Sequence, residues 1–201
     1  MISRTVKRCG RGFTLVELLV VLVIMAILGA LVMSSPNLWR STNVTVAGNQ
    51  LMEDLAFARE LAVSSNEPTE VWFLRPTGGT LFSASQIYQV DQTGIWSPYG
   101  GVHHLPGNIG ADSGTTLSSL FAASNKKVWS SQAQASIPGY GMSYDAWAIR
   151  FMPDGSLGTA AKNLFLTLHD ISLGDPLTML PANYSLINID YVTGAATLYR
   201  P

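Results

Sequence analysis

Residues 13–33 read FTLVELLVVLVIMAILGALVM, and this stretch decides how the chain is organised. It carries a single charge, Glu17, and from residue 18 onward it contains only apolar side chains and Gly29. A helix rises about 1.5 Å per residue, so a run of this length spans roughly 32 Å, enough to cross a hydrocarbon core about 30 Å thick. The stretch therefore predicts a transmembrane helix, which we assign to residues 13–35.

The charges that flank this stretch predict its orientation. The first twelve residues contain Arg4, Lys7, Arg8 and Arg11 and no acid, and no Lys or Arg follows the apolar run until Arg40. Because basic flanks stay on the cytoplasmic side, we expect a cytoplasmic N-terminus and a single-pass topology. A cleaved secretory signal peptide is the alternative. Its apolar region is usually about 7–15 residues without an acid, and no small-x-small cleavage site closely follows this one.

The composition limits what the rest of the chain can do. Of the 201 residues, 47% are hydrophobic and 12% are charged, and this excludes a disordered or highly charged protein. The net charge is −1, but without the first twelve residues 8 basic and 13 acidic residues remain, which gives −5. Such a remainder is a poor binder of polyanions. The single cysteine, Cys9, excludes an intrachain disulfide and a Cys-ligated zinc site.

A second helical segment follows the membrane run. Ser34, Ser35 and Pro36 interrupt the apolar pattern, and Pro36 predicts a kink because proline removes a helical hydrogen bond. Residues 36–66 then form a predicted amphipathic helix that ends near Asn66 and packs on a sheet. Its apolar stripe recurs every three or four residues and consists of Val44, Ala47, Leu51, Leu55, Ala58 and Ala62.

From residue 70 onward the apolar pattern has the period of two that is typical of strands. Predicted strands cover residues 71–74, 87–90, 146–151, 164–168, 184–191 and 195–199. The predicted fold class is therefore α+β: a long N-terminal helix, membrane half plus amphipathic half, packed on an antiparallel β-sheet domain at residues 67–201.

Residues 97–141 show little periodicity and predict a long loop, which in a compact domain is usually functional or mobile. Aromatic residues in and beside this loop are suited either to protein contacts or to covering the sheet edge. They are Trp96, Tyr99, Trp129, Tyr140 and Tyr144.

Residues 12–18, GFTLVEL, resemble the processing signal of the type IV pilin superfamily. The resemblance implies that residues 1–12 are a prepilin leader, which a prepilin peptidase removes after Gly12. Phe13 would become the new N-terminus and be N-methylated. The α-amino group of Phe13 on one subunit would then meet Glu17 of its neighbour, so that Glu17 sets the register of assembly.

Three later stretches, residues 51–62, 151–155 and 187–194, resemble the minor pseudopilins of type II secretion, in the H-type or FimT-like subgroup. The resemblance implies a structural subunit in the inner membrane, surrounded by lipid, with a periplasmic C-terminal domain. Its partners would be major and minor pseudopilins and the inner-membrane assembly platform. The fibre would secrete proteins across the outer membrane, powered by a separate motor, because the chain has no phosphate-binding loop motif.

The alternative is a FimT-like minor pilin that acts in pilus assembly or DNA uptake. Members that take up DNA use a basic C-terminal region, whereas the tail after Gly194 contains only Arg200. Outside the leader, Lys126 and Lys127 form the only pair of adjacent basic residues. Nucleic acid is therefore not expected as a partner.

An enzymatic function has little support in the sequence. His103-His104 and His169-Asp170 are the only clusters that suggest metal or acid–base chemistry, and adjacent histidines point in different directions on a strand. Asp170 and Asp175 lack the intervening ligands of a calcium loop. We therefore expect no enzyme activity and assign no metal and no cofactor.

Overall fold

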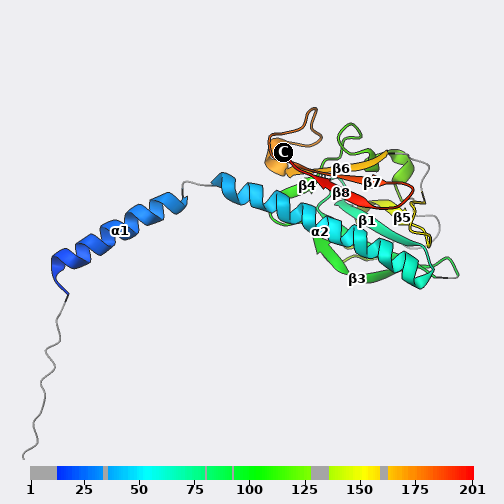
Figure 1. Cartoon of the computed structure of the whole chain (residues 1–201), viewed down its shortest axis with the longest axis horizontal. Coiled ribbons are helices and arrows are strands. Elements are labelled where there is room, and N and C mark those ends of the chain that lie inside the picture. Colours follow the sequence, from blue (N-terminus) through cyan, green and yellow to red (C-terminus); the bar gives the residue numbers. More distant parts are fainter. Residues whose placement is uncertain (1–12, 34–35, 80, 92, 128–135, 159–162) are drawn as a thin grey trace, which may run out of the picture. The chain divides into compact units, whose positions relative to one another are not determined.

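The computed structural model describes residues 13–33, 36–79, 81–91, 93–127, 136–158 and 163–201. The chain divides into two compact units, Met1–Trp39 and Arg40–Pro201. Helix α1 (Leu15–Met33) lies in the first unit, and most of helix α2 (Pro36–Ser65) lies in the second. The fold is α+β, and Figure 1 shows α2 laid across the antiparallel strands of the second unit.

Helix α1 consists almost entirely of residues with long apolar side chains, and every residue from Leu15 to Ala30 is exposed. Among the described residues, no helix combines the length and the apolar character needed to cross a membrane.

The segment of the predicted kink is described only in part. Residues 34–35 lie outside the described residues, and α2 begins at Pro36. Proline fits the first turn of a helix because its missing N–H would have no partner within the helix there.

The apolar stripe of α2 forms the centre of the second unit. All six predicted stripe residues, from Val44 to Ala62, are at most 1% exposed. A Cβ atom at Gly48 would lie 3.2 Å from Leu198 Cδ1 and from Ser185 Oγ, so glycine lets the helix approach the strands closely. The helix ends at Ser65, and Asn66 adopts a left-handed conformation, φ 55°, that is typical of a helix C-terminus.

In the described part of the chain, eight strands form two four-stranded antiparallel sheets, whereas the sequence predicted one sheet. The first has the order β3-β2-β1-β5 and the second the order β4-β6-β7-β8. The strands are β1 (Thr69–Pro76), β2 (Ala84–Val90), β3 (Trp96–His104), β4 (Ile109–Ala111), β5 (Tyr144–Phe151), β6 (Asn163–Asp170), β7 (Ser185–Asp190) and β8 (Ala196–Tyr199). Because pairing partners are chosen by tertiary contacts, the period of two does not show how strands divide between sheets.

The main core joins the α2 stripe to both sheets. It contains Val71 and Phe73 of β1, Ile149 of β5, and Leu166 and Ile187 of the second sheet. A second, smaller core lies on the other face of the first sheet and includes Trp72, Leu74, Tyr88 and Tyr144. Strand β1 is therefore buried on both faces, so it is apolar at consecutive positions from Val71 to Leu74 rather than at alternate ones.

The segment at residues 97–141 was predicted to be a long loop, and this prediction is wrong. It contains most of β3, all of β4 and two short 3-10 helices, η1 (Ser119–Phe121) and η2 (Ala123–Asn125). Strand β3 is an edge strand that carries Pro98 and two glycines and is mostly exposed, so it lacks an alternating apolar pattern. Strand β4 has only three residues, which is too short for a periodic signal.

Most of the aromatic residues in and beside this region cover the sheet. Tyr144 is buried in the second core, and Trp96 and Tyr140 pack against it. Tyr99 remains 44% exposed, with its ring centroid 5.7 Å from that of Phe57 on α2. Trp129 lies outside the described residues.

The second core encloses a tyrosine in an apolar environment. The rings of Tyr88 and Trp72 stack with their centroids 3.7 Å apart, and Tyr88 is 2% exposed. Burial, with an added contribution from Tyr144, raises the pKa of Tyr88 well above its ordinary value of 10.0. A raised pKa favours the neutral phenol in the folded state. Its contribution to stability is therefore complete below about pH 10 and is lost as the pH rises further.

We predict that Tyr88 ionises only above the ordinary tyrosine pKa of 10.0 during an alkaline titration followed by tyrosinate absorbance. Tyr88→Phe should remove absorbance from the high-pH end of the titration curve, since burial favours the neutral phenol of this side chain. Tyr199→Phe is the control, because it alters a side chain that is 53% exposed, and it should leave the high-pH step of Tyr88 in place. Loss of absorbance only below about pH 10 in Tyr88→Phe would contradict the buried environment.

Candidate assembly surface

The N-terminus of α1 is shaped by a side-chain cap. The Glu17 N–H donates a hydrogen bond to Thr14 Oγ1 at 3.2 Å, and the Leu18 N–H donates to the Thr14 carbonyl at 3.1 Å. Thr14 is therefore the N-cap, and Glu17 is the third residue of the helix. This role of Thr14 was missed from the sequence, although a Thr-x-x-Glu pattern before an apolar run is a recognisable signal.

Glu17 stands in an exposed apolar surface. Leu15 is 80% exposed and Val16 69%, and Leu18 and Leu19 are more than half exposed. Within the part of the chain that the structure describes, the Glu17 carboxylate has no hydrogen bond and no ion pair. The helix dipole favours a carboxylate in this first turn, by about 0.3–1 kcal/mol. The first turns of α1 therefore present one negative charge surrounded by exposed apolar side chains.

The other residues of the predicted processing site are described in part. Phe13 lies two residues before the first residue of α1 and is 76% exposed. Gly12 lies outside the described residues, so the geometry of the predicted cleavage site is not described.

Arg59 of α2 connects two turns that are distant in sequence. Its Nε atom donates a 2.7 Å hydrogen bond to the carbonyl of Thr193 and a 3.4 Å bond to that of Gly155. Thus the three stretches that resemble minor pseudopilins meet at one end of the domain. Gly155 (φ 83°) and Gly194 (φ 65°) both adopt left-handed conformations, and a Cβ on Gly194 would lie 2.2 Å from the Gly155 carbonyl oxygen.

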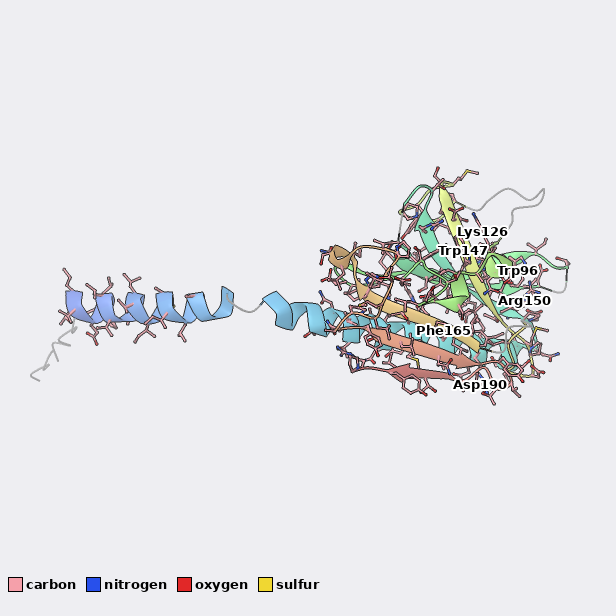
Figure 2. All side chains as sticks on the ribbon, turned by 90° about the horizontal axis from the view of Figure 1, so that it is seen from above. Trp96, Lys126, Trp147, Arg150, Phe165 and Asp190 are labelled. Carbon is pink, nitrogen blue, oxygen red and sulfur yellow. The ribbon has the colours of Figure 1, made fainter. Side chains whose placement is uncertain are left out.

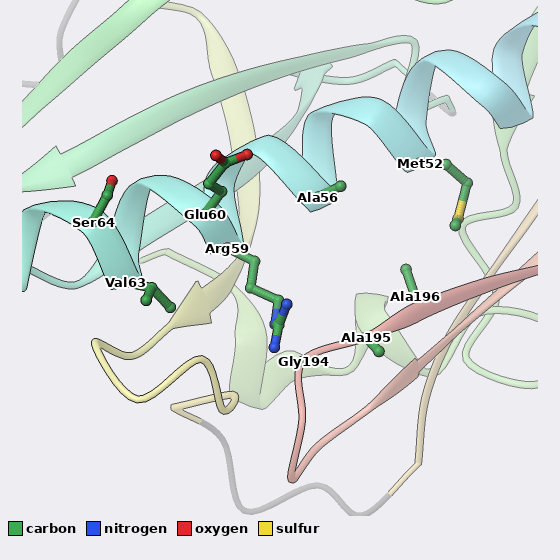
Figure 3. A pocket seen from close by; sticks show the side chains of 9 residues that line it. All are labelled: Met52, Ala56, Arg59, Glu60, Val63, Ser64, Gly194, Ala195 and Ala196. Atoms are coloured by element: carbon green, nitrogen blue, oxygen red, sulfur yellow. The ribbon is translucent and has the colours of Figure 1, made fainter.

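A groove of about 580 Å³ lies beside this junction, between α2 and the β7–β8 turn. Figure 3 shows Arg59 pointing from α2 toward Gly194, whereas Glu60 and Ser64 point away from the turn. The groove is lined by Met52, Ala56, Arg59, Glu60, Val63, Ser64, Gly194, Ala195 and Ala196. Its lining combines apolar groups with one cation and one acid, a composition suited to contact with another protein.

Four basic residues of the domain, Arg75, Lys126, Lys127 and Arg150, are engaged in internal ion pairs. Buried Glu70 accepts from Lys127 Nζ at 2.7 Å and from Arg150 Nε at 2.8 Å. The Arg150 guanidinium also lies 5.0 Å from the ring centroid of Trp96, and Figure 2 shows these two side chains near each other. Such pairing reduces the charge available to bind nucleic acid phosphates.

Asp145 is paired with two cations. Its carboxylate lies 3.1 Å from Arg75 Nη2 and 3.1 Å from Lys126 Nζ. Partial burial opposes ionisation, but the hydrogen bonds and charges of Arg75 and Lys126 outweigh it. The pKa of Asp145 therefore lies below its ordinary value of 3.8. Arg200 of the tail likewise bonds to Thr45 and, at 3.1 Å, to Asn183.

The predicted histidine clusters separate in the structure. His103 Nδ1 lies 2.6 Å from Asp54 Oδ1 of α2, whereas His104 stacks on Tyr140. Neighbouring residues of a strand face opposite sides, as the sequence analysis expected. The Asp170 side chain accepts a hydrogen bond from the Ser172 N–H and caps η3 (Ile171–Leu173), so it does not join Asp175 in a calcium loop.

One group of titratable side chains was missed from the sequence. Asp112, His169 and Asp175 place one ligand-type atom each within 4.8 Å of one another, and Asp112 and His169 are completely buried. Asp112 follows the three-residue strand β4 inside the predicted loop, far from the other two positions. No ligand spacing motif connects the three residues, so the sequence alone held no signal that would have found this group.

Comparisons with known proteins match both parts of the chain. A family model described as the prokaryotic N-terminal methylation motif matches residues 7–33, and one described as type II transport protein GspH matches residues 47–179. No curated protein matches the chain.

Two solved structures resemble the fold. One is the minor pseudopilin EpsH from the type 2 secretion system of Vibrio cholerae, with 10% identity, a TM-score of 0.46, and 79% of this chain and 98% of that chain covered. The other is the type IV minor pilin FimU of Pseudomonas aeruginosa, with 14% identity, a TM-score of 0.47, and 80% and 93% covered.

We predict that Gly194→Ala lowers the free energy of unfolding by about 3 kcal/mol or more, since it adds a backbone clash to the cost of a left-handed alanine. Gly141→Ala is the matched control. Its φ is 60°, no atom lies within 4 Å of the added Cβ, and the expected loss is only about 1–2 kcal/mol. Urea unfolding of the full chain in detergent measures both losses. Equal losses would contradict the close approach of the two turns.

Proposed function

Because the chain belongs to the type II transport protein GspH family, we propose that it is a minor pseudopilin of a type II secretion pseudopilus. Membership in this family, together with the methylation motif, makes the chain a pilin-like subunit of the minor pseudopilin or minor pilin kind. The observation that carries the proposal is the exposed apolar helix α1, with one unpaired carboxylate in its first turn among the described residues.

Membrane anchoring by residues 13–35 is part of the proposal. The apolar run in the sequence has the length of a bilayer core, and the basic leader before it favours a cytoplasmic N-terminus. The domain that follows would lie in the periplasm, with the inner-membrane lipids around the anchor. The methylation motif at residues 7–33 supports this arrangement.

Processing of the leader is the first chemical step that we propose. A prepilin peptidase would cleave after Gly12, and the new α-amino group of Phe13 would be methylated. Removal of residues 1–12 also removes four basic side chains from the membrane surface. The new N-terminus would lie four residues before Glu17, about one helical turn away.

Assembly would depend on Glu17. A carboxylate at the centre of a bilayer costs about 2.5–3.5 kcal/mol, and an unpaired amine there carries a similar penalty. If the Phe13 amine of one subunit contacts Glu17 of its neighbour, both charges are compensated only at one stagger of the two helices. The hydrogen bond that the Glu17 N–H donates to Thr14 Oγ1 holds the backbone of Glu17 in the first turn, which keeps the carboxylate close to the helix N-terminus.

The proposed role is structural. The subunit would assemble with major and minor pseudopilins on the inner-membrane platform into a periplasmic fibre, and a separate ATP-driven motor would extend this fibre to move proteins across the outer membrane. A minor pilin in a retractile pilus is the second reading of the same family. DNA uptake has less support, because Lys127, Lys126 and Arg200 all make contacts within the domain.

We predict that Glu17→Val leaves membrane insertion and leader cleavage intact but reduces copurification with other pilin-like proteins at least tenfold after mild crosslinking in native membranes. The reason is that valine cannot pair with the Phe13 amine of a neighbour. Leu18→Val is the matched control, since it alters an exposed apolar side chain of the same turn but keeps the carboxylate. Its copurification should remain close to that of the unmodified chain.

The same crosslinking experiment tests the proposed role. Secretion-type pseudopilins among the copurified proteins are the expected result, whereas pilus-type subunits alone would favour the second reading. If Glu17→Val assembles normally, or if both variants fail equally, the carboxylate does not set the register.

We also predict that Gly12→Val blocks leader removal, because the bulky side chain cannot fit where the peptidase requires glycine. Gly10→Val, two residues earlier in the same leader, is the control and should be cleaved normally. The mass of the intact protein measures the outcome: the control should begin at methylated Phe13 and Gly12→Val at Met1. Removal of the leader from both variants, or from neither, would contradict cleavage after Gly12.

A further inference from the structure

A buried cluster of one histidine and two aspartates lies in the second sheet, at a distance in sequence from every residue of the proposed assembly mechanism. Asp112 directly follows β4, His169 lies in β6, and Asp175 follows η3. Strands β4 and β6 pair with Gly110 opposite His169, which brings Asp112 beside the histidine ring. The side chains of Asp112 and His169 are 0% exposed and that of Asp175 is 2% exposed.

The histidine ring is oriented by its backbone partner. His169 Nδ1 lies 2.9 Å from the carbonyl oxygen of Asp170, so this nitrogen donates a hydrogen bond. Nε2 then faces the two aspartates, with its lone pair directed toward them when the ring is neutral. Histidines that bind metal ions usually donate their second ring N–H to a carbonyl or carboxylate in this way.

The distances within the cluster are too long for hydrogen bonds. His169 Nε2 lies 3.4 Å from Asp112 Oδ2 and 3.8 Å from Asp175 Oδ1, whereas a charged N–H···O bond is about 2.7–2.9 Å long. Among the buried atoms of the described residues, His169 Nε2 and Asp175 Oδ2 have no hydrogen-bond partner. A buried polar atom without a partner costs about 1–3 kcal/mol, and here two such atoms belong to side chains of one cluster.

Both carboxylates are held in place by backbone N–H groups. Asp112 accepts from Gly114 at 2.9 Å and from Leu177 at 2.7 Å, and Asp175 accepts from Ser113 at 2.8 Å. Within the described part of the chain, His169 is the only cation-forming side chain within ion-pair distance of either carboxylate. The cluster is therefore rigid and rich in negative charge, although it is shielded from water.

We propose that Asp112, His169 and Asp175 bind a divalent transition-metal ion of the Zn²⁺ class. Zinc binds His nitrogen and carboxylate oxygen at about 2.0–2.2 Å, and tetrahedral geometry then separates neighbouring ligand atoms by about 3.3–3.6 Å. The Nε2–Oδ distances of 3.4 and 3.8 Å are close to this separation. The imidazole ligand favours zinc over Ca²⁺ and Mg²⁺, which prefer oxygen ligands alone.

The bound ion would join three segments of the second sheet. It would connect the end of β4, the end of β6 and the loop that contains Asp175, and its two positive charges would balance the two carboxylates. The role is structural rather than catalytic and does not depend on the position of the subunit in a fibre. The expected consequence is a domain that is more stable with zinc than without it.

The test uses the full chain in detergent, carrying Cys9→Ser so that its only thiol cannot bind zinc. After removal of metal with a chelator, zinc alone is added and its content per chain is measured. We expect one zinc ion per chain. At a zinc concentration about 100 times the dissociation constant, the melting temperature should rise by roughly 5–10 °C. Cobalt in place of zinc should give the visible absorption bands of a tetrahedral site.

Asp112→Asn and Asp175→Asn keep the shape of the side chain and should each weaken zinc binding at least tenfold, which reduces the thermal shift to about half or less. His103→Gln is the control, because His103 is half exposed and lies outside the cluster, and it should bind zinc normally. Having two variants protects the test if one of them does not fold. The proposal is wrong if the unmodified chain binds no zinc, or if both Asn variants bind it as tightly. It is also wrong if zinc raises the melting temperature of neither the unmodified chain nor His103→Gln.

Discussion

The burial of one helical stripe against two sheets is the interaction on which the domain at residues 40–201 depends. The stripe of α2 contacts apolar residues from both sheets, so removing the helix would expose the main core of each. Burying a leucine side chain such as Leu51 or Leu55 contributes about 1.5–3 kcal/mol. The small stripe residues Ala47, Ala58 and Ala62 allow the helix to approach the sheets closely. The Arg59 hydrogen bonds to two turns then fix the rotation and the position of the helix.

This use of α2 contrasts with α1. The apolar side chains of α1 are exposed as far as the structure describes them, and they have no equivalent sheet within their own unit. A soluble monomer would leave a large apolar surface in water, which is unfavourable. The proposed function supplies two apolar environments that can cover this surface: lipid and the helices of neighbouring subunits. The charge of Glu17 favours a neighbouring subunit over lipid, because an unpaired carboxylate is costly in lipid.

Buried charges elsewhere in the domain are compensated by protein groups. Glu70 is paired with Lys127 and Arg150, and Asp54 accepts from Ser85 and contacts His103. The cluster around His169 differs, because its imidazole and one carboxylate oxygen face each other without a hydrogen bond. This difference is the reason for assigning a metal ion there and not to the other buried charges, whose neighbours already neutralise them.

Local patterns in the sequence determined the long helical segments, the apolar stripe of α2 and six strands (β1, β2, β5, β6, β7 and β8). Those features repeat with the period of their own secondary structure. The leader, Phe13 and Glu17 were also visible, since they are neighbours in sequence. Tertiary structure alone decided the division into two sheets, the edge strand β3, and the meeting of Arg59 with Gly155 and Thr193. It also brought Asp112 to His169 and Asp175. These depend on pairing between residues far apart in the chain, for which periodicity carries no information.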